Sequence, residues 1–121
     1  MVYALIIEPI GGPLFALFQE MYASVEQGST LADALTLLER KPTLDAIVVD
    51  FAVALSEGSP VPEWEQMSHY AKKPGRAIVI VHPEIHPAFD TLVKSGDMSW
   101  IQKQEGYAAN TLTGVNDHLG G

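Results

Sequence analysis

Short apolar runs and stretches of helical spacing alternate along the whole chain. The apolar runs predict strands at residues 3–7, 23–26, 45–51, 77–81 and 99–102. Glu8 and Pro9 end the first of these runs. The run at 45–51 is apolar and β-branched at successive positions, which is typical of a strand covered on both faces of a parallel sheet. We therefore expect this run to lie in the centre of the sheet.

Segments with apolar residues three and four positions apart predict helices at 13–22, 30–41, 62–73, 87–95 and 106–119. Thr30 and Asp33 have the spacing of a helix start capped by a hydroxyl group, and Gly96 suits a helix end. The segment 52–62 is rich in glycine and proline and is expected to be a loop. The residues expected to face the core from these helices include Leu14, Leu17, Phe18, Met21, Tyr22, Leu31, Ala34, Leu35, Leu38, Trp64, Met67, Ala71, Ala88, Phe89 and Leu92.

The order of these elements predicts the fold. Regular alternation of strands and helices over 121 residues indicates one α/β domain, residues 1–121. Crossovers between parallel strands are right-handed, and they place helices on both faces of the sheet. Five strands favour the flavodoxin-like, doubly wound (βα)5 arrangement with strand order 2-1-3-4-5.

The charge of the chain is strongly acidic. Fifteen acidic residues against seven lysines and arginines give a formal net charge of −8. The basic residues cluster only at Arg40-Lys41 and at Lys72-Lys73-Arg76, near expected helix ends, where the helix dipole favours cations. Binding to nucleic acid requires clustered positive charge, so we expect no direct contact with nucleic acid.

The absence of cysteine and of long apolar segments narrows the cellular setting. A chain without cysteine forms no disulfide and has no thiolate chemistry. No apolar run approaches the roughly 18 residues of a membrane span. Glu8 interrupts the first run too early for a signal peptide. We expect a soluble, cytoplasmic protein that has no contact with a membrane.

Four chemically active side chains follow four of the expected strands: Glu8, Asp50, His82 and Lys103. Ligands of open α/β sheets bind beyond the carboxyl ends of the strands, where the strand order reverses. Two carboxylates and a lysine in one crevice suit a hard cation and a phosphoryl group. The residues alone also permit a structural interpretation, in which Asp50 accepts N–H bonds from a loop and Glu8 and Lys103 are surface residues.

Three motifs resemble the receiver domains of response regulators. Residues 4–8, Ala-Leu-Ile-Ile-Glu, are similar to the first receiver strand, which normally ends in two consecutive acids. Residues 45–50, Asp-Ala-Ile-Val-Val-Asp, are similar to the strand that ends in the phosphoacceptor aspartate. Residues 96–103, Gly-Asp-Met-Ser-Trp-Ile-Gln-Lys, are similar to the run from a glycine through a switch aromatic to a lysine. In order and register the resemblance covers about residues 3–119.

The resemblance implies a role for each site residue. Asp50 would accept a phosphoryl group from a sensor histidine kinase. Glu8, Asp50 and the backbone carbonyl of Ala52 would hold Mg²⁺, which offsets charge on the transferring group. Lys103 would pair with the carboxylate and then with the phosphate, and Trp100 would be the switch aromatic. The family is not enzymatic beyond self-catalysed phosphotransfer and dephosphorylation. Its members contact an output partner or form homodimers, here through a face spanning about residues 88–119.

Three departures from the family pattern predict an atypical site. Pro9 stands where the second acid is expected, which weakens the predicted binding of Mg²⁺. His82 stands where the family has a small hydroxyl residue that bonds the phosphoryl group. Gln104 replaces the proline that usually follows the lysine. The remaining histidines lack metal-ligand spacing and are expected to have surface roles: His69, His86 and His118.

The alternative hypothesis is a flavodoxin-like domain that binds a small molecule or an anion in the same crevice. Its pocket would be lined by Gly11, Gly12, Asp50 and His82. The glycines do not form a nucleotide-binding pattern, because Pro13 and the proline after Glu8 remove backbone donors that a phosphate cradle uses.

Overall fold

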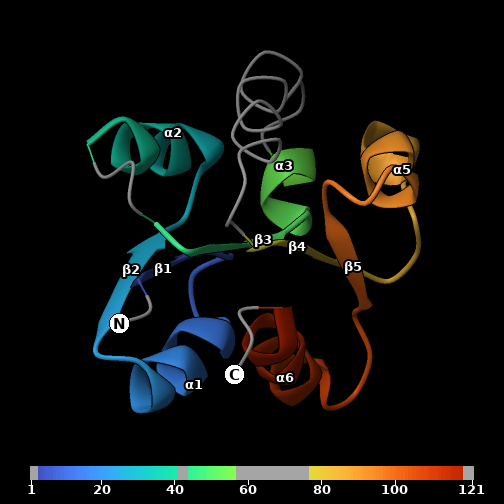
Figure 1. Cartoon of the computed structure of the whole chain (residues 1–121). Helices are drawn as coiled ribbons and strands as arrows, with labels where there is room; N and C mark the ends of the chain where they lie inside the picture. The colour runs from blue at the N-terminus through green and yellow to red at the C-terminus, as the bar shows by residue number, and fades with distance from the viewer. Residues whose placement is uncertain (1–2, 41–43, 57–76, 119–121) are drawn as a thin grey trace.

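The computed structural model of the chain describes residues 3–40, 44–56 and 77–118 (Figure 1). Strands and helices alternate through these residues. The strands are β1 (Tyr3–Ile7), β2 (Ser24–Gly28), β3 (Ala46–Asp50), β4 (Ala77–His82) and β5 (Ser99–Gln102). The helices are α1 (Leu14–Met21), α2 (Leu31–Arg40), α3 (Ala52–Ser56), α5 (Pro87–Lys94) and α6 (Tyr107–His118).

The five strands form one parallel sheet in the order β2-β1-β3-β4-β5. Helices α2, α3 and α5 lie on one side of the sheet, and α1 and α6 lie on the other (Figure 1). The predicted α/β class, strand order and flavodoxin-like doubly wound arrangement are therefore confirmed. Because β1 pairs with both β2 and β3, the strand order reverses between β1 and β3. Ligands of such sheets bind at this point of reversal, beyond the carboxyl ends of the strands.

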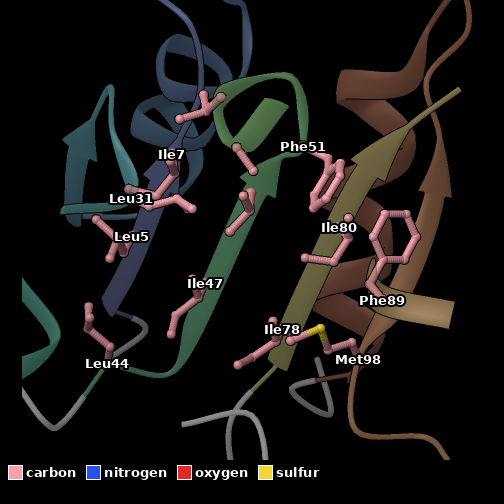
Figure 2. Close-up of a cluster of buried hydrophobic side chains, with 13 residues drawn as sticks. Leu5, Ile7, Leu31, Leu44, Ile47, Phe51, Ile78, Ile80, Phe89 and Met98 are labelled. Carbon is pink, nitrogen blue, oxygen red and sulfur yellow. The ribbon is translucent and has the colours of Figure 1, made fainter. Parts of the chain in front are cut away.

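Alternate side chains of the central strands enter two cores, one on each face of the sheet. Leu5 and Ile7 of β1 belong to one core, and Ala4 and Ile6 belong to the other. Burial of one large apolar side chain contributes about 1.5–3 kcal/mol, so the two cores together fix the strand ends firmly. The first core, drawn in Figure 2, is completed by Leu31, Leu44, Ile47, Val49, Phe51, Val53, Ala54, Ile78, Ile80, Phe89 and Met98.

The expected element boundaries agree closely with the structure. The strands match to within two residues at each end, and the four helices that fall on described residues match to within one. At the start of α2 the backbone N–H of Asp33 donates to the hydroxyl of Thr30 at 3.0 Å, as the capping pattern predicts. Gly96, which follows α5, has a φ of +85°, the left-handed backbone that ends many helices.

The segment after β3 differs from the prediction. Residues 52–62 were expected to form a loop, yet Ala52–Ser56 form the short helix α3. Phe51, Val53 and Ala54 are all buried in the first core. Burial of this apolar stretch holds the start of the segment in a helical turn, and the glycine and prolines come only later.

Two helix faces are rotated relative to the prediction. The buried face of α1 contains Leu14 and Phe18, with Tyr22 packed beside them, whereas Met21 is 57% exposed. In α5, Phe89 is fully buried and Ala88 is exposed, so the expected inward position of Ala88 is wrong. In both helices the large aromatic side chain decides which face turns to the sheet.

Several predictions concern residues outside the described ranges. They are the helix at 62–73 with Trp64, Met67 and Ala71, the cluster Lys72-Lys73-Arg76, and His69. Within the described ranges, no helix is both long and apolar enough to cross a membrane.

Candidate functional site

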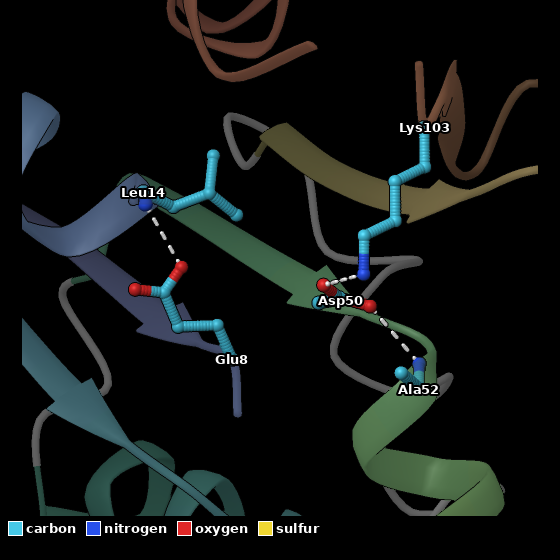
Figure 3. A network of polar contacts seen from close by, with 5 residues as sticks. All are labelled: Glu8, Leu14, Asp50, Ala52 and Lys103. Atoms are coloured by element: carbon cyan, nitrogen blue, oxygen red, sulfur yellow. Dashed lines mark hydrogen bonds and ion pairs between the residues drawn. The ribbon is translucent and has the colours of Figure 1, made fainter. Parts of the chain in front are cut away.

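Asp50 and Lys103 form an ion pair at the carboxyl edge of the sheet. Asp50 ends β3 and is only 2% exposed. The ammonium nitrogen of Lys103, which follows β5, lies 2.7 Å from Oδ2 of Asp50 (Figure 3). The pair joins residues 53 positions apart and reaches across the end of β4, which lies between the two strands. The lysine side chain is 31% exposed, so the pair is sealed on the aspartate side and open to water on the lysine side.

The second oxygen of Asp50 is also engaged. Its Oδ1 accepts a hydrogen bond from the backbone N–H of Ala52 at 3.0 Å, at the first residue of α3. The backbone N–H of Phe51 donates to the carbonyl of Val81 on β4 at 2.9 Å. Asp50 therefore has both of the features weighed for it from the sequence, a loop N–H bond and a lysine partner.

Glu8 lies at the same edge but serves a different element. Its side chain is 1% exposed, so the interpretation as a surface acid is wrong. Oε2 accepts the backbone N–H of Leu14 at 2.9 Å, and Oε1 accepts that of Phe15 at 3.1 Å (Figure 3 shows the first bond). Both donors belong to the first turn of α1, and the N-cap residue Pro13 contributes no side-chain cap. Glu8 thus caps α1 from the preceding loop.

Gly12 makes this position of Glu8 possible. A Cβ atom at residue 12 would lie 2.7 Å from both Cδ and Oε2 of Glu8, well inside van der Waals contact. Only a residue without a side chain lets the carboxylate approach the helix so closely.

The electrostatics of Glu8 combine opposing influences. Burial raises the pKa of this carboxyl above its ordinary value. The two N–H bonds from Phe15 and Leu14 lower the pKa, as does the charge of Lys103, whereas the charge of Asp50 raises it. Burial dominates because little of the carboxylate is left to water.

The carboxylate oxygens that would bind Mg²⁺ already have hydrogen-bond partners. This ion prefers a few carboxylate oxygens together with water in octahedral geometry. Both oxygens of Glu8 accept N–H groups of α1, and both oxygens of Asp50 have partners in Ala52 and Lys103. Residues 3–40, 44–56 and 77–118 contain no group of three or more His, Cys, Asp or Glu side chains able to hold a metal ion. Binding of Mg²⁺ stays a prediction from the resemblance alone.

His82 ends β4 and connects the lysine to Trp100. Its backbone carbonyl accepts the backbone N–H of Lys103 at 3.0 Å and the indole N–H of Trp100 at 2.9 Å. Trp100 also packs against the first core. One carbonyl thereby ties the expected switch aromatic to the residue that pairs with Asp50.

The imidazole of His82 is half-buried and lies among aromatic rings. Its centroid is 5.4 Å from that of Phe51 and 6.1 Å from that of Phe89, both in edge-to-face geometry. Burial lowers the pKa of His82, and the neighbouring His86 lowers it further. A neutral ring at neutral pH retains one N–H donor, a single donor where the family has a hydroxyl group.

His86 is the residue whose importance the sequence analysis missed. It was expected to have only a surface role, but it is half-buried and caps α5 through a bond from the backbone N–H of Ala88 to Nδ1 at 3.0 Å. A signal was present, because Pro87 favours the first position of a helix and thereby marks residue 86 as the cap. The side chains of His69 and His118 lie outside the described part of the chain.

A pocket of about 340 Å³ lies beyond the ends of β1 and β2. It shares Gly11 with the lining expected for a small-molecule site, but it borders neither Asp50 nor His82. Its lining residues are Glu8, Ile10, Gly11, Gln27, Gly28, Ser29 and Asp33.

Comparison of the chain with protein-family models, with curated proteins and with solved structures gave no match in any of the three.

Proposed function

We propose that this chain is an atypical receiver-like domain of a two-component system, which signals through contact with another protein. The observation that carries the proposal is the bond between Lys103 and Asp50 at the carboxyl edge of a 2-1-3-4-5 sheet. This pair combines a nearly buried acid with a lysine that water can reach. A change in charge on Asp50 would therefore act first on Lys103, its ion-pair partner.

The connection from this pair to the surface supports a signalling role. The backbone N–H of Lys103 and the indole of Trp100 share the carbonyl of His82. A movement of Lys103 would therefore disturb the end of β5 and the packing of Trp100. The face formed by α5, β5 and α6 is the expected contact surface for an output partner or for a second copy of the chain. Asp90 and Lys94, paired at 3.0 Å on α5, supply charges of both signs to it.

Phosphorylation of Asp50 is the chemical part of the proposal. An oxygen of Asp50 would attack the phosphorus of an acyl phosphate or a phosphohistidine, and the bond to the donor would break. The ammonium of Lys103 and the N–H of Ala52 are placed to stabilise charge on the new acyl phosphate. The donor set of Glu8 and Asp50 gives no support for a metal ion in this step.

The test is incubation with acetyl phosphate, with and without Mg²⁺, followed by intact-mass measurement. The expected result is one added phosphoryl group in the wild type and none in Asp50→Asn. Asp117→Asn, which alters an exposed acid on α6, is the matched control and should be modified like the wild type. The Trp64→Phe variant retains Trp100 as its single tryptophan. Its fluorescence is measured with and without beryllofluoride. Equal modification of Asp50→Asn and wild type would refute a reactive Asp50.

Contact with a second copy is tested separately by sedimentation over a range of concentrations. We expect the wild type to form a dimer and Asp90→Lys to weaken it. If the contact is constitutive, the dimer should persist unchanged when a phosphoryl donor is added. A monomer at all concentrations would rule out the homodimer and leave a different protein as the partner.

A second candidate function is binding of a small molecule at the same edge of the sheet. The pocket beyond β1 and β2 favours it. Because Glu8 and Asp33 line this pocket and no basic residue does, a neutral or cationic molecule suits it better than an anion. A rise in melting temperature with a panel of small amines, absent in Asp33→Asn, would favour this function over signalling.

A further inference from the structure

The N-terminus of α5 is capped by an imidazole. His86 has an extended backbone, and its Nδ1 accepts a hydrogen bond from the backbone N–H of Ala88 at 3.0 Å. Pro87, the first residue of α5, has no N–H to offer. Only an Nδ1 atom that carries no proton can accept this bond. The cap therefore requires a neutral His86 with its proton on Nε2.

The ring of His86 also belongs to a cluster of four rings at the carboxyl edge of the sheet. Its centroid lies 5.0 Å from Phe51, 6.0 Å from His82 and 6.3 Å from Phe89. Phe51 directly follows Asp50, and Phe89 is fully buried in the first core. The cluster therefore joins the start of α5 to the ends of β3 and β4.

Charges of both signs surround this cluster. The backbone N–H of Asp90 donates to the carbonyl of His86 at 3.0 Å, so an acidic residue stands in the first turn of α5. Helix α3, which follows Phe51, carries no titratable side chain. The other titratable or charged groups near the cluster, within the described part of the chain, are His82, Glu84, Asp50, Lys103 and Lys94.

We propose that His86 is a proton-sensitive cap that loosens α5 when the solution becomes acidic. A proton on Nδ1 removes the acceptor of the Ala88 bond. It also places a positive charge at the positive end of the helix dipole. The same charge lies next to the imidazole ring of His82. An unperturbed imidazole is the side chain that changes charge between pH 5 and pH 8. Asp90 offsets part of the new charge, but it does not replace the lost acceptor.

This inference rests on the cap and the ring cluster and does not depend on the proposed signalling function. Its consequence is that the first turn of α5, on the expected contact face, opens in acid while the sheet stays folded. Helix α2, which also has a side-chain cap, provides an internal reference. There Asp33 donates its N–H to the hydroxyl of Thr30, a group that does not titrate in this range.

The experiment is amide exchange measured by NMR on the whole chain from pH 7.5 to pH 5.0. The quantity followed is the ratio of the protection factors of Ala88 and Asp33, which cancels changes in global stability. In the wild type we expect the ratio to fall by about fivefold, the equivalent of losing an ordinary N-cap. In His86→Asn the ratio should stay constant, because asparagine caps helices well and carries no titrating group.

One further result sharpens the test. The ¹⁵N shifts of the His86 ring at pH 7.5 should identify the tautomer with its proton on Nε2. A constant ratio in the wild type, or an equal fall in His86→Asn, would overturn the proposal.

Discussion

Glu8 and Asp50 are two buried carboxylates at the same edge of one sheet, and each is stabilised in a different way. Glu8 follows β1 and binds two N–H groups of a helix that begins six residues later. Asp50 ends β3 and binds a lysine 53 residues away. The partners of Glu8 are two backbone N–H groups, whereas Asp50 is paired with a lysine side chain that is 31% exposed.

The difference separates a structural acid from a responsive one. A carboxylate held by backbone N–H groups moves only if its helix moves. One that is held by Lys103 loses its partner through a single change of rotamer or of charge. Glu8 and Asp50 both follow or end a buried strand, yet their replacement should affect the protein differently. The substitutions below test this difference.

The largest effect is expected from Glu8→Ala. This change leaves the N–H groups of Leu14 and Phe15 without their acceptor at a buried helix start. The free energy of unfolding should fall by about 2–3 kcal/mol in urea denaturation. Glu20→Ala, at an exposed position of α1, is the control and should change little. A loss for Glu8→Ala no greater than for the control would contradict its capping role.

Gly12→Ala should act through the same carboxylate. The new Cβ would push Glu8 away from α1, and we expect a loss of about 1–3 kcal/mol. Gly114→Ala in α6 is the matched control, because its Cβ would meet Ile101 at an ordinary 3.6 Å. Since both changes remove one interaction, Gly12→Ala combined with Glu8→Ala should cost less than the sum. Full additivity would show that the two residues act separately.

Lys103→Met tests the responsive acid. It leaves the carboxylate of Asp50 buried without its ion partner, which costs about 1–2 kcal/mol after allowance for the water that reaches the lysine. Adding Asp50→Asn should recover part of this loss, since asparagine keeps an acceptor for Ala52 without the charge. The same urea titrations measure both variants. If Asp50→Asn brings no recovery in the Lys103→Met background, the pair is not an electrostatic unit.

The smallest effect is the dependence of stability on pH at Glu8. Burial raises the pKa of this carboxyl in the folded protein above the unfolded value. The folded state therefore keeps the proton to higher pH, and the stability from this source is present at low pH. It is lost as pH rises from the unfolded pKa through the folded pKa. Compared with the wild type, Glu8→Gln should gain relative stability as pH rises from about 4. A difference that is constant with pH would contradict the raised pKa.

Much of the arrangement follows from the sequence because it depends on periodicity. Parallel strands end at a common edge, so the register of apolar runs was enough to bring Asp50 and Lys103 together. The same reasoning gave the cap of α2 from Thr30 and Asp33 and the helix end at Gly96. These features depend on residues close in sequence or on the strict period of strands.

Side-chain direction at the edge could not be predicted in the same way. Nothing in the strand pattern states whether Glu8 turns toward β3 or toward α1. The decisive residue is Gly12, whose missing Cβ opens the path to the helix. His86 was overlooked because its chemistry was judged as a metal ligand, whereas its place before Pro87 marked it as a helix cap. The start of 52–62 was assigned to a loop because the later glycine and prolines outweighed the apolar residues Val53 and Ala54, which are buried.

The capping of α1 by Glu8 also bears on which ligands this edge accepts. Helix N-termini bind anions, and free N–H groups at Leu14 and Phe15 would be expected to bind a phosphate from solution. Here that place is taken by a carboxylate on the same chain, a tethered competitor with an effective concentration on the order of millimolar. A free anion would have to displace a partner that never diffuses away. The N-terminus of α1 is in this sense closed to free anions by its own carboxylate, which leaves Lys103, 31% exposed, as the charge of the site that water reaches.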